Sequence, residues 1–480
     1  MKSLFRRARS TDQLKPKLVP SPLISLPEDV LIAVLAHVDV ADIIRLRRVN
    51  KIFKDLTKTL IVWVHALKWF PLVLHHRPDT EIAQEIEDAL VFSCKLEQKL
   101  SSSKLTTRSG WILSEAVGGE LWTPNMCIAR DYLVVSGSEN GFLCVNLATK
   151  TSWKIPVPDY PVAHWVNAME MTLKGELGLV VVIRSLERMR KAVVYFQPLP
   201  ELPCDGRAHE LITITVNDKI SCAELSGSSV LVGSASGEIT RVDLEHMVTQ
   251  KYNVGGHIWD AAIYDQFLVV SHSSTGSRIT IVALSPLNNL TDQNGDSATD
   301  SVKTITQRDL NTSSDQSREV FAVGLPKLAL PALSTPDRAI RLFTHPLPII
   351  HLAHSFIIPH QDSEGRVDAV HFNIPKVPFS SLPFLRNSTS WTVSCIRAGH
   401  SRAMSLISVR TSSGNSQELI LTDVQEDRSV VHKRVNIHSK KLADSLLERG
   451  GELAWDEPSG RVCVCTRRAR QKCVITVLEL

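Results

Sequence analysis

The sequence predicts a mainly β fold that follows a short all-α module. Helical periodicity dominates up to Ser101, whereas short apolar runs separated by turn residues fill the chain from Trp111 onward. Two of these runs also repeat, turn included, at Tyr132–Leu147 and at Val230–Leu244. A chain of 480 residues is longer than one core usually supports, so we expect two folded parts.

Composition excludes several classes of protein. The chain has 54 basic and 50 acidic residues, a net charge of +4, so a dominant nucleic-acid surface is not indicated. No apolar run is long enough to cross a membrane, and nine scattered cysteines without a C-x-x-C pair do not form a disulfide framework. We expect a cytoplasmic or nuclear protein with no cofactor, whose residues 1–20 are a disordered basic tail.

The first folded part is predicted over residues 21–68. Ser25 and Glu28 have the spacing of a helix cap, and Val30–Ala36 is apolar on every face for two turns. Asp39 and Asp42 indicate a second helix start, after which apolar residues recur at helical spacing up to Leu67. A unit this small rarely buries that much apolar surface alone, so the surplus indicates a partner. The alternative is that these helices are the first layer of a larger helical domain.

The residues themselves favour the partner. Leu26-Pro27-Glu28-Asp29-Val30-Leu31, together with the spaced Val34-Leu35, Val38-Asp39, Asp42-Ile43-Ile44, Leu46, Val49, Phe53 and Trp63, resembles the F-box family. Asn50 and Phe53 depart from the residues that many members carry at these positions, Cys and Trp. The resemblance implies docking on a Skp-type adaptor within a cullin-RING (SCF-type) ubiquitin ligase. The implied contact set is Leu26, Pro27, Leu31, Val34, Leu35, Val38, Ile43, Leu46 and Val49.

Residues 69–105 are predicted to be a helical connector, because apolar residues recur at helical spacing over Thr80–Ser101. The β part then covers residues 106–480. Its strand centres lie roughly 40 to 50 residues apart, which predicts a β-propeller of roughly six to eight blades and resembles divergent WD-repeat propellers. A β-sandwich pair is the alternative. The polar stretch at about 286–319 is expected to be a disordered insertion, and the run Cys473–Leu480 to complete the last blade.

We find no sequence motif that requires catalysis, so an enzyme is not expected. Cys463 and Cys465 face one side of a strand, where small core residues are the simpler interpretation than a reactive thiol pair. The basic residues between Arg45 and Lys58 fit a solvated helix face better than a phosphate site. Five tryptophans fit blade packing better than a client pocket: Trp111, Trp122, Trp153, Trp165 and Trp259.

Together these features predict a non-enzymatic substrate receptor, which holds the ligase by its helices and an unknown protein client by its propeller. The alternatives are a scaffold with a non-degradative role and, less favoured, a propeller enzyme or nucleic-acid binder. Because a closed propeller has its own core, residues 106–480 are expected to fold alone.

Overall fold

The computed structural model divides into two compact units. The helical unit comprises residues 1–70 and 78–91, and the β unit comprises residues 71–77 and 92–480. The residues that the structure describes are 26–69, 81–113, 125–138, 141–156, 163–185, 190–199, 208–226, 228–258, 260–264, 267–271, 278–283, 304–309, 319–323, 350–352, 355–361, 367–373, 390–398, 402–411, 414–424, 430–446, 451–467 and 473–480.

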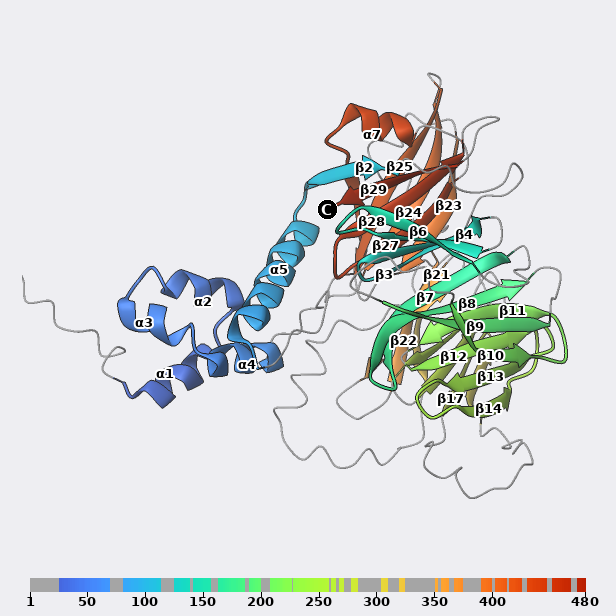
Figure 1. The fold of residues 1–480 in the computed structure, drawn as a ribbon, viewed down its shortest axis with the longest axis horizontal. Coiled ribbons are helices and arrows are strands. Elements are labelled where there is room, and N and C mark those ends of the chain that lie inside the picture. Colours follow the sequence, from blue (N-terminus) through green and yellow to red (C-terminus); the bar gives the residue numbers. More distant parts are fainter. Residues whose placement is uncertain are drawn as a thin grey trace, which may run out of the picture. The chain divides into compact units, whose positions relative to one another are not determined.

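Four short helices and half of a longer one build the helical unit (Figure 1): α1 (Glu28–Leu35), α2 (Val40–Leu46), α3 (Lys51–Leu56), α4 (Leu60–Trp69) and the first half of α5 (Ala83–Ser101). The Asp39 side chain caps α2 by accepting from the backbone N–H of Ala41, as predicted. The expected cap on α1 is not seen, because Pro27 occupies the N-cap position without a side-chain bond, and Ser25 lies outside the described residues.

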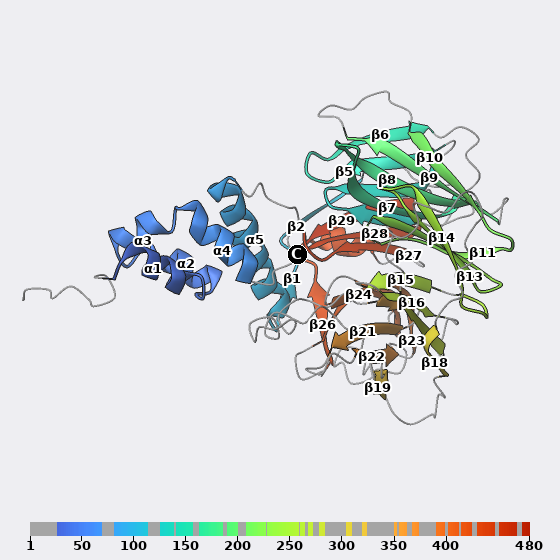
Figure 2. The same ribbon diagram turned by 90° about the horizontal axis from the view of Figure 1, so that it is seen from below.

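The β unit consists of seven sheets among the described residues, six of four strands and one of five. Figures 1 and 2 show these sheets coloured in chain order. The first blade consists of β3 (Met126–Ala129), β4 (Tyr132–Ser138), β5 (Gly141–Asn146) and β6 (Thr151–Pro156), and the second of β7 (Ala163–Leu173), β8 (Glu176–Ser185), β9 (Lys191–Pro198) and β10 (His209–Thr215). The third blade consists of β11 (Ile220–Ser226), β12 (Ser229–Ser234), β13 (Glu238–Asp243) and β14 (Val248–Asn253). The fourth consists of β15 (Asp260–Tyr264), β16 (Phe267–Ser271), β17 (Arg278–Ala283) and β18 (Thr304–Asp309).

Three further blades complete the set. The fifth blade consists of β20 (Ile350–Leu352), β21 (Ser355–Gln361), β22 (Val367–Asn373) and β19 (Glu319–Val323). The sixth consists of β23 (Ser390–Ala398), β24 (Arg402–Thr411), β25 (Gly414–Val424), β26 (Val430–Asn436) and β1 (Leu105–Thr106). The seventh and last consists of β27 (Gly451–Asp456), β28 (Arg461–Arg467), β29 (Cys473–Glu479) and β2 (Ser109–Ile112). A short helix, α7 (Lys440–Ser445), lies between the last two blades in the sequence.

The seven blades close into a ring. One edge strand of each blade contacts its counterpart in the next, in the order β3, β7, β11, β15, β20, β23, β27 and back to β3. Such a ring of twisted four-stranded sheets is a β-propeller, and the count lies within the predicted range. Buried apolar residues fill the spaces between blades; one cluster, for example, joins Leu133 and Val145 of the first blade to Cys463 and Val477 of the last.

Closure of the ring uses a strand from the start of the β unit. Outermost in the last blade is β2, which pairs antiparallel with β29, from Ser109 opposite Glu479 to Ile112 opposite Thr476. The run Cys473–Leu480 therefore forms the third strand of that blade, and residues 109–112 supply the fourth. Just before it in the sequence, β1 pairs in parallel with β26 as a fifth strand of the neighbouring blade. The segment after α5 thus ties the last two blades together.

The repeats recognised in the sequence are the second and third strands of their blades, β4–β5 and β12–β13, and the same kind of turn follows each repeat. Asn146, at the end of β5, accepts from the backbone N–H groups of Ala148 and Thr149. Asp243, at the end of β13, accepts in the same way from residues 245 and 246. Four residues after each cap the backbone turns left-handed, at Lys150 (φ 62°) and Met247 (φ 54°). Both turns therefore use one capping geometry, although their sequences differ.

One part of the expected insertion at 286–319 is a strand. Residues 304–309 form β18, which pairs with β17 from Arg278 opposite Asp309 to Val282 opposite Thr304. An outermost strand needs little large apolar surface, which is why the polar sequence Thr-Ile-Thr-Gln-Arg-Asp concealed it. Residues 286–303 and 310–318 lie outside the described residues.

Candidate functional site: an apolar surface on the helical unit

Helix α1 places its apolar residues on two faces. Leu31 and Leu35 are buried, with 3% and 1% of their surface exposed. Val30 and Val34, which are also four residues apart, share another face of the helix, and 39% and 42% of their surface is exposed. Leu26, just before the helix, is 38% exposed. The inner face builds the core of the unit, and the outer face is available to a partner.

A second exposed apolar set lies around α3 and α4. Val49, in the turn before α3, is 70% exposed and Ile52, in its first turn, is 44% exposed. Leu60 and Ile61, which begin α4, are 37% and 47% exposed. Together with the outer face of α1, these residues form what we call the docking surface: Leu26, Val30, Val34, Val49, Ile52, Leu60 and Ile61.

The nine residues that the resemblance implies as contacts occupy three kinds of environment. Four are exposed: Leu26, Pro27, Val34 and Val49. Val38 and Leu46 are half-buried, whereas Leu31, Leu35 and Ile43 are buried core residues. Val30 and Ile52 are exposed but absent from that set. For Val30 the signal was present, because it lies one helical turn from Val34, which is in the set.

Buried aromatic residues support the docking surface from inside. Phe53 and Trp63 are 5% and 0% exposed. The indole N–H of Trp63 donates to the backbone carbonyl of Thr57 over 2.9 Å, so the polar group of this buried side chain has a hydrogen-bond partner. The bond fixes α4 to the end of α3, and thereby fixes the exposed residues that both helices carry.

Arg47 holds the helical unit together, a role that the sequence did not reveal. Its guanidinium donates to both carboxylate oxygens of Glu87 over 2.7 Å and to the carbonyl of Thr57 over 2.8 Å. It also lies 5.6 Å from the ring centre of Trp63. The sequence placed Arg47 in a solvated basic stripe, but its side chain is only 23% exposed. Its partner Glu87 is 40 residues away, so no local pattern indicates the pair.

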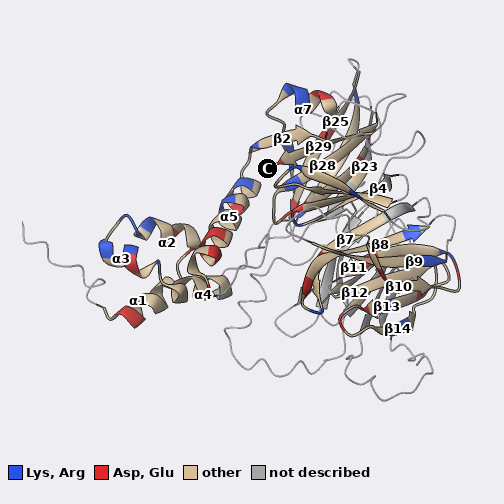
Figure 3. Cartoon of the chain, in the orientation of Figure 1, with Lys and Arg blue, Asp and Glu red and all other residues tan. Residues whose placement is uncertain are grey.

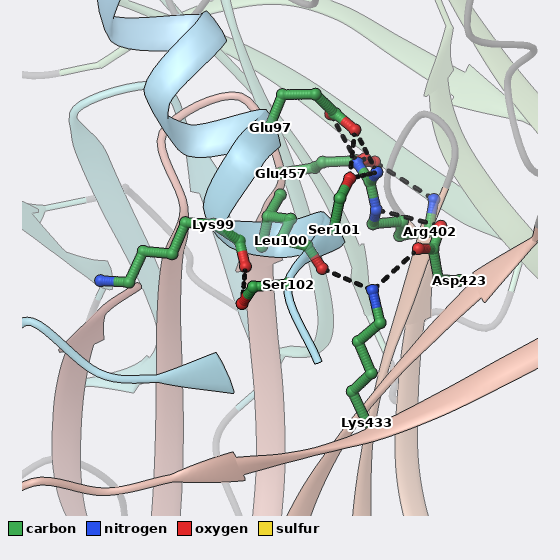
Figure 4. A network of polar contacts seen from close by, with 9 residues as sticks. All are labelled: Glu97, Lys99, Leu100, Ser101, Ser102, Arg402, Asp423, Lys433 and Glu457. Carbon is green, nitrogen blue, oxygen red and sulfur yellow. Dashed lines mark hydrogen bonds and ion pairs between the residues drawn. The ribbon is translucent and has the colours of Figure 1, made fainter. Parts of the chain in front are cut away.

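The β unit contains a second charged centre, around Arg402 (Figure 4). Arg402 begins β24, and its guanidinium bonds Glu97 of α5 and, over 3.0 Å, Glu457 of the β27–β28 turn. Its Nε lies 3.2 Å from Asp423 Oδ1. Lys433 completes the group by donating to Asp423 over 3.1 Å and to the carbonyl of Leu100 over 2.8 Å. Two cations and three carboxylates thus join the end of α5 to the last two blades.

These contacts alter the acidity of the charged groups. Burial alone would raise the pKa of Glu97, but the hydrogen bond and positive charge of Arg402 outweigh it, so this pKa lies below its ordinary value of 4.5. Burial likewise opposes the charge of Arg402, and its hydrogen bond to Glu97 and the surrounding carboxylates nevertheless raise its pKa. Both groups therefore remain charged at neutral pH, and the centre is a structural ion-pair cluster.

The other candidates for chemistry are structural. Cys463 and Cys465 are fully buried. Burial raises the pKa of Cys463, and a hydrogen bond with Cys473 does so for Cys465, so neither is a ready nucleophile. Among the described residues no cluster of His, Cys, Asp or Glu has metal-binding geometry, and no described helix has the length and apolar character to span a membrane.

The tryptophans support blade packing where the structure describes them. Trp111 packs against the cluster between the last and first blades. Trp153 packs against the next cluster and meets Tyr132 edge-on, with ring centres 6.1 Å apart. Trp122 and Trp259 lie outside the described residues, as does the side chain of Trp165.

Comparisons with known proteins address both parts of the chain. The profile of the F-box domain matches residues 23–65. Solved structures similar to the chain include the WD40 domain of Toxoplasma gondii coronin, at 10% identity and a TM-score of 0.39, covering 78% of this chain and 87% of that one. Another is a mitotic checkpoint complex, at 10% identity and a TM-score of 0.41, covering 78% and 96%. The comparison with curated proteins gives no match.

The matched residues are those that carry the docking surface and its supporting core, and the sheets that follow form the closed ring described above. The chain therefore carries an F-box domain at residues 23–65, followed by a β-propeller.

Proposed function

We propose that this chain is the substrate receptor of an SCF-type, cullin-RING ubiquitin ligase. In this proposal the F-box docks on a Skp-type adaptor, the adaptor connects it to the cullin scaffold, and the propeller holds a protein client. The observation that carries the proposal is the docking surface, because a small helical unit that exposes seven large apolar residues gains stability by covering them. The chain itself supplies binding and no catalytic step.

The implied contact residues take two roles in this proposal. Leu26, Pro27, Val34 and Val49 contact the adaptor directly, together with Val30 and Ile52. Leu31, Leu35 and Ile43 act from the core by holding α1 and α2 in place, while Val38 and Leu46 lie at the border between the two groups. Substituting a buried member therefore unfolds the unit, whereas substituting an exposed one removes contact area from a folded unit.

Binding of the purified chain to a purified Skp-type adaptor tests the proposal. The double variant Leu26→Ala/Val34→Ala is expected to lose about 3 kcal/mol of binding free energy, roughly a hundredfold in Kd, because two aliphatic side chains no longer bury their surface. The matched control is Leu177→Ala/Met247→Ala, whose residues are equally exposed but lie in the β unit. Leu26→Ala/Pro27→Ala tests the entry to α1 separately and is also expected to remove most of the binding.

Circular dichroism must show that the variants remain folded. Adaptor binding by both Ala variants at the affinity of the unchanged chain contradicts the proposal, as does a wild-type chain that does not bind the adaptor at all.

A further inference from the structure

Four exposed basic residues lie in and beside α3, in the same stretch as Val49 and Ile52 of the docking surface. We call them the basic face. Arg48, Lys51, Lys54 and Lys58 are all exposed, against a single exposed acid, Asp55, in the same stretch. The two lysines at 51 and 54 lie one turn apart on α3, so they share a face of the helix. Figure 3 shows basic residues gathered around α3, where Asp55 is the one acidic residue of the helix, while most acidic residues of the unit lie at the start of α1, at α2 and on α5.

These four cations differ from their basic neighbours. Arg45 pairs with Asp42 over 2.6 Å, and Arg47 pairs with Glu87 over 2.7 Å, so both are neutralised within the unit. Among the described residues no carboxylate forms an ion pair with Arg48, Lys51, Lys54 or Lys58. Their charge is therefore available to another molecule.

Exposed apolar residues lie within the basic face. Val49 follows Arg48, and Ile52 follows Lys51, with 70% and 44% of their surface exposed. A face that is merely solvated has no need of two aliphatic side chains among its charges. The combination of an apolar centre and a charged rim is typical of a protein–protein interface.

The chemistry of the face selects the class of partner. Single-stranded nucleic acids are held by aromatic stacking as well as by charge, and no aromatic residue is exposed over 48–58, where Phe53 is buried. Binding along a membrane surface requires a helix with a long apolar face, whereas α3 has six residues. A protein surface rich in carboxylates beside aliphatic residues satisfies both the cations and Val49 and Ile52.

We propose that Arg48, Lys51, Lys54 and Lys58 form a basic rim that engages a carboxylate-rich surface of the adaptor, next to the apolar contact made by Val49 and Ile52. This inference rests on the proposed function, since it assigns a second, electrostatic part to the same docking surface. Charges at the edge of an interface act mainly on the association rate and on its salt dependence. The apolar residues set affinity, and the basic rim sets how fast the adaptor is found.

Stopped-flow or surface-based kinetics with purified full-length chain and Skp-type adaptor test the inference. The variant Lys51→Glu/Lys54→Glu is expected to associate about tenfold more slowly at low salt, near 50 mM, with rates that converge with those of the wild type at about 0.5 M salt. The control Lys440→Glu/Lys441→Glu changes the net charge equally, at exposed lysines of α7, and is expected to leave the rate unchanged.

The outcomes separate this inference from the function on which it rests. If the wild-type chain does not bind the adaptor, the proposed function fails. If the wild type binds but the charge variant associates at the wild-type rate with the same salt dependence, only the basic rim is refuted. Comparable loss in the α7 control also refutes it, because a general effect of net charge then explains the result. DNA oligonucleotides and anionic vesicles are tested in the same way. If either one binds through Lys51 and Lys54, while adaptor association does not depend on these lysines, the face belongs to another partner and the proposal is overturned.

Discussion

The helical unit and the β unit differ in how much of their apolar surface they bury. In residues 26–69 seven large apolar residues are exposed, whereas the described residues of the β unit expose four: Phe92, Leu177, Met247 and Val431. The β unit is many times longer, and its apolar residues gather between neighbouring blades. A closed ring lets every sheet cover both of its faces, but four short helices cannot do so. The propeller is a complete ring by itself, whereas the helical unit leaves an apolar surface that, in the proposed function, the adaptor covers.

The largest expected effect concerns where the complete unit begins. Leu96 and Leu100 of α5 are buried among residues of the last two blades, and Glu97 bonds Arg402. A chain that starts at residue 106 loses three buried leucines, because Leu105 is removed as well, and it loses the half-exposed ion-pair partner Glu97. We expect this loss to cost more than about 5 kcal/mol. We therefore expect residues 92–480 to be soluble and folded, and residues 106–480 to aggregate or melt far lower.

Differential scanning fluorimetry of the two fragments compares them directly. Equal melting temperatures would show that the second half of α5 is not part of the β unit. That result would restore the boundary expected from the sequence, near residue 105.

A single charge in the β unit gives the next largest effect. Arg402→Ala leaves Glu97, Asp423 and Glu457 without their shared cation, so unfolding free energy should fall by about 3 to 5 kcal/mol. Arg434→Ala is the control, because its side chain is 45% exposed and its pair with Glu418 contributes less than about 1 kcal/mol. Urea unfolding followed by tryptophan fluorescence measures both. Equal, small losses would mean that the Arg402 cluster does not stabilise the propeller.

The helical unit offers a matched pair of neighbouring arginines. Arg47→Ala should cost about 1 to 3 kcal/mol, since it removes the two bonds to Glu87 and the contact with Trp63. Arg45→Ala should cost less than about 0.5 kcal/mol, because Arg45 is 74% exposed and pairs only with Asp42. Thermal melts of the helical unit, followed by circular dichroism, distinguish them. Two equal melting temperatures would mean that Arg47 contributes no more to stability than a solvated surface residue.

The smallest effect depends on pH. Glu97→Gln should lower stability at neutral pH by about 1 kcal/mol or less, because Glu97 is half-exposed and Arg402 keeps two other carboxylates. A carboxylate whose pKa is lowered on folding stabilises above its unfolded pKa, and this contribution is lost as pH falls through the folded pKa, which lies below 4.5. The melting temperatures of wild type and variant should therefore converge in acid. A difference that persists unchanged below that range contradicts the assignment.

Local patterns in the sequence predicted most of the architecture. The apolar run Val30–Ala36 located α1, and the recurring hairpins predicted a propeller with a number of blades in the observed range. The Arg402 cluster escaped prediction because Glu97 and Arg402 are 305 residues apart, and no periodicity links them. Strand β18 was missed for a different reason: a polar strand at the edge of a blade has the composition of a loop.

Which apolar residues of the F-box are exposed was also beyond the sequence. Leu31, Val34 and Leu35 are equally apolar and lie in one helix, yet the packing of α4 against α1 buries two and leaves the third exposed. Periodicity identifies a helix and its faces, but the position of the neighbouring helix decides which face is covered.

The proposed function requires that the F-box delivers to a ligase the protein that the propeller holds. It is tested most directly by quantitative affinity purification from cells that carry the wild-type chain or the Leu26→Ala/Val34→Ala variant, with and without proteasome inhibition. We expect a bound protein that the variant retains at high level without the inhibitor and that the wild type retains only with it, because delivery leads to degradation. An identical set of bound proteins under all four conditions, with unchanged half-lives, would contradict the claim and favour a scaffold with a non-degradative role.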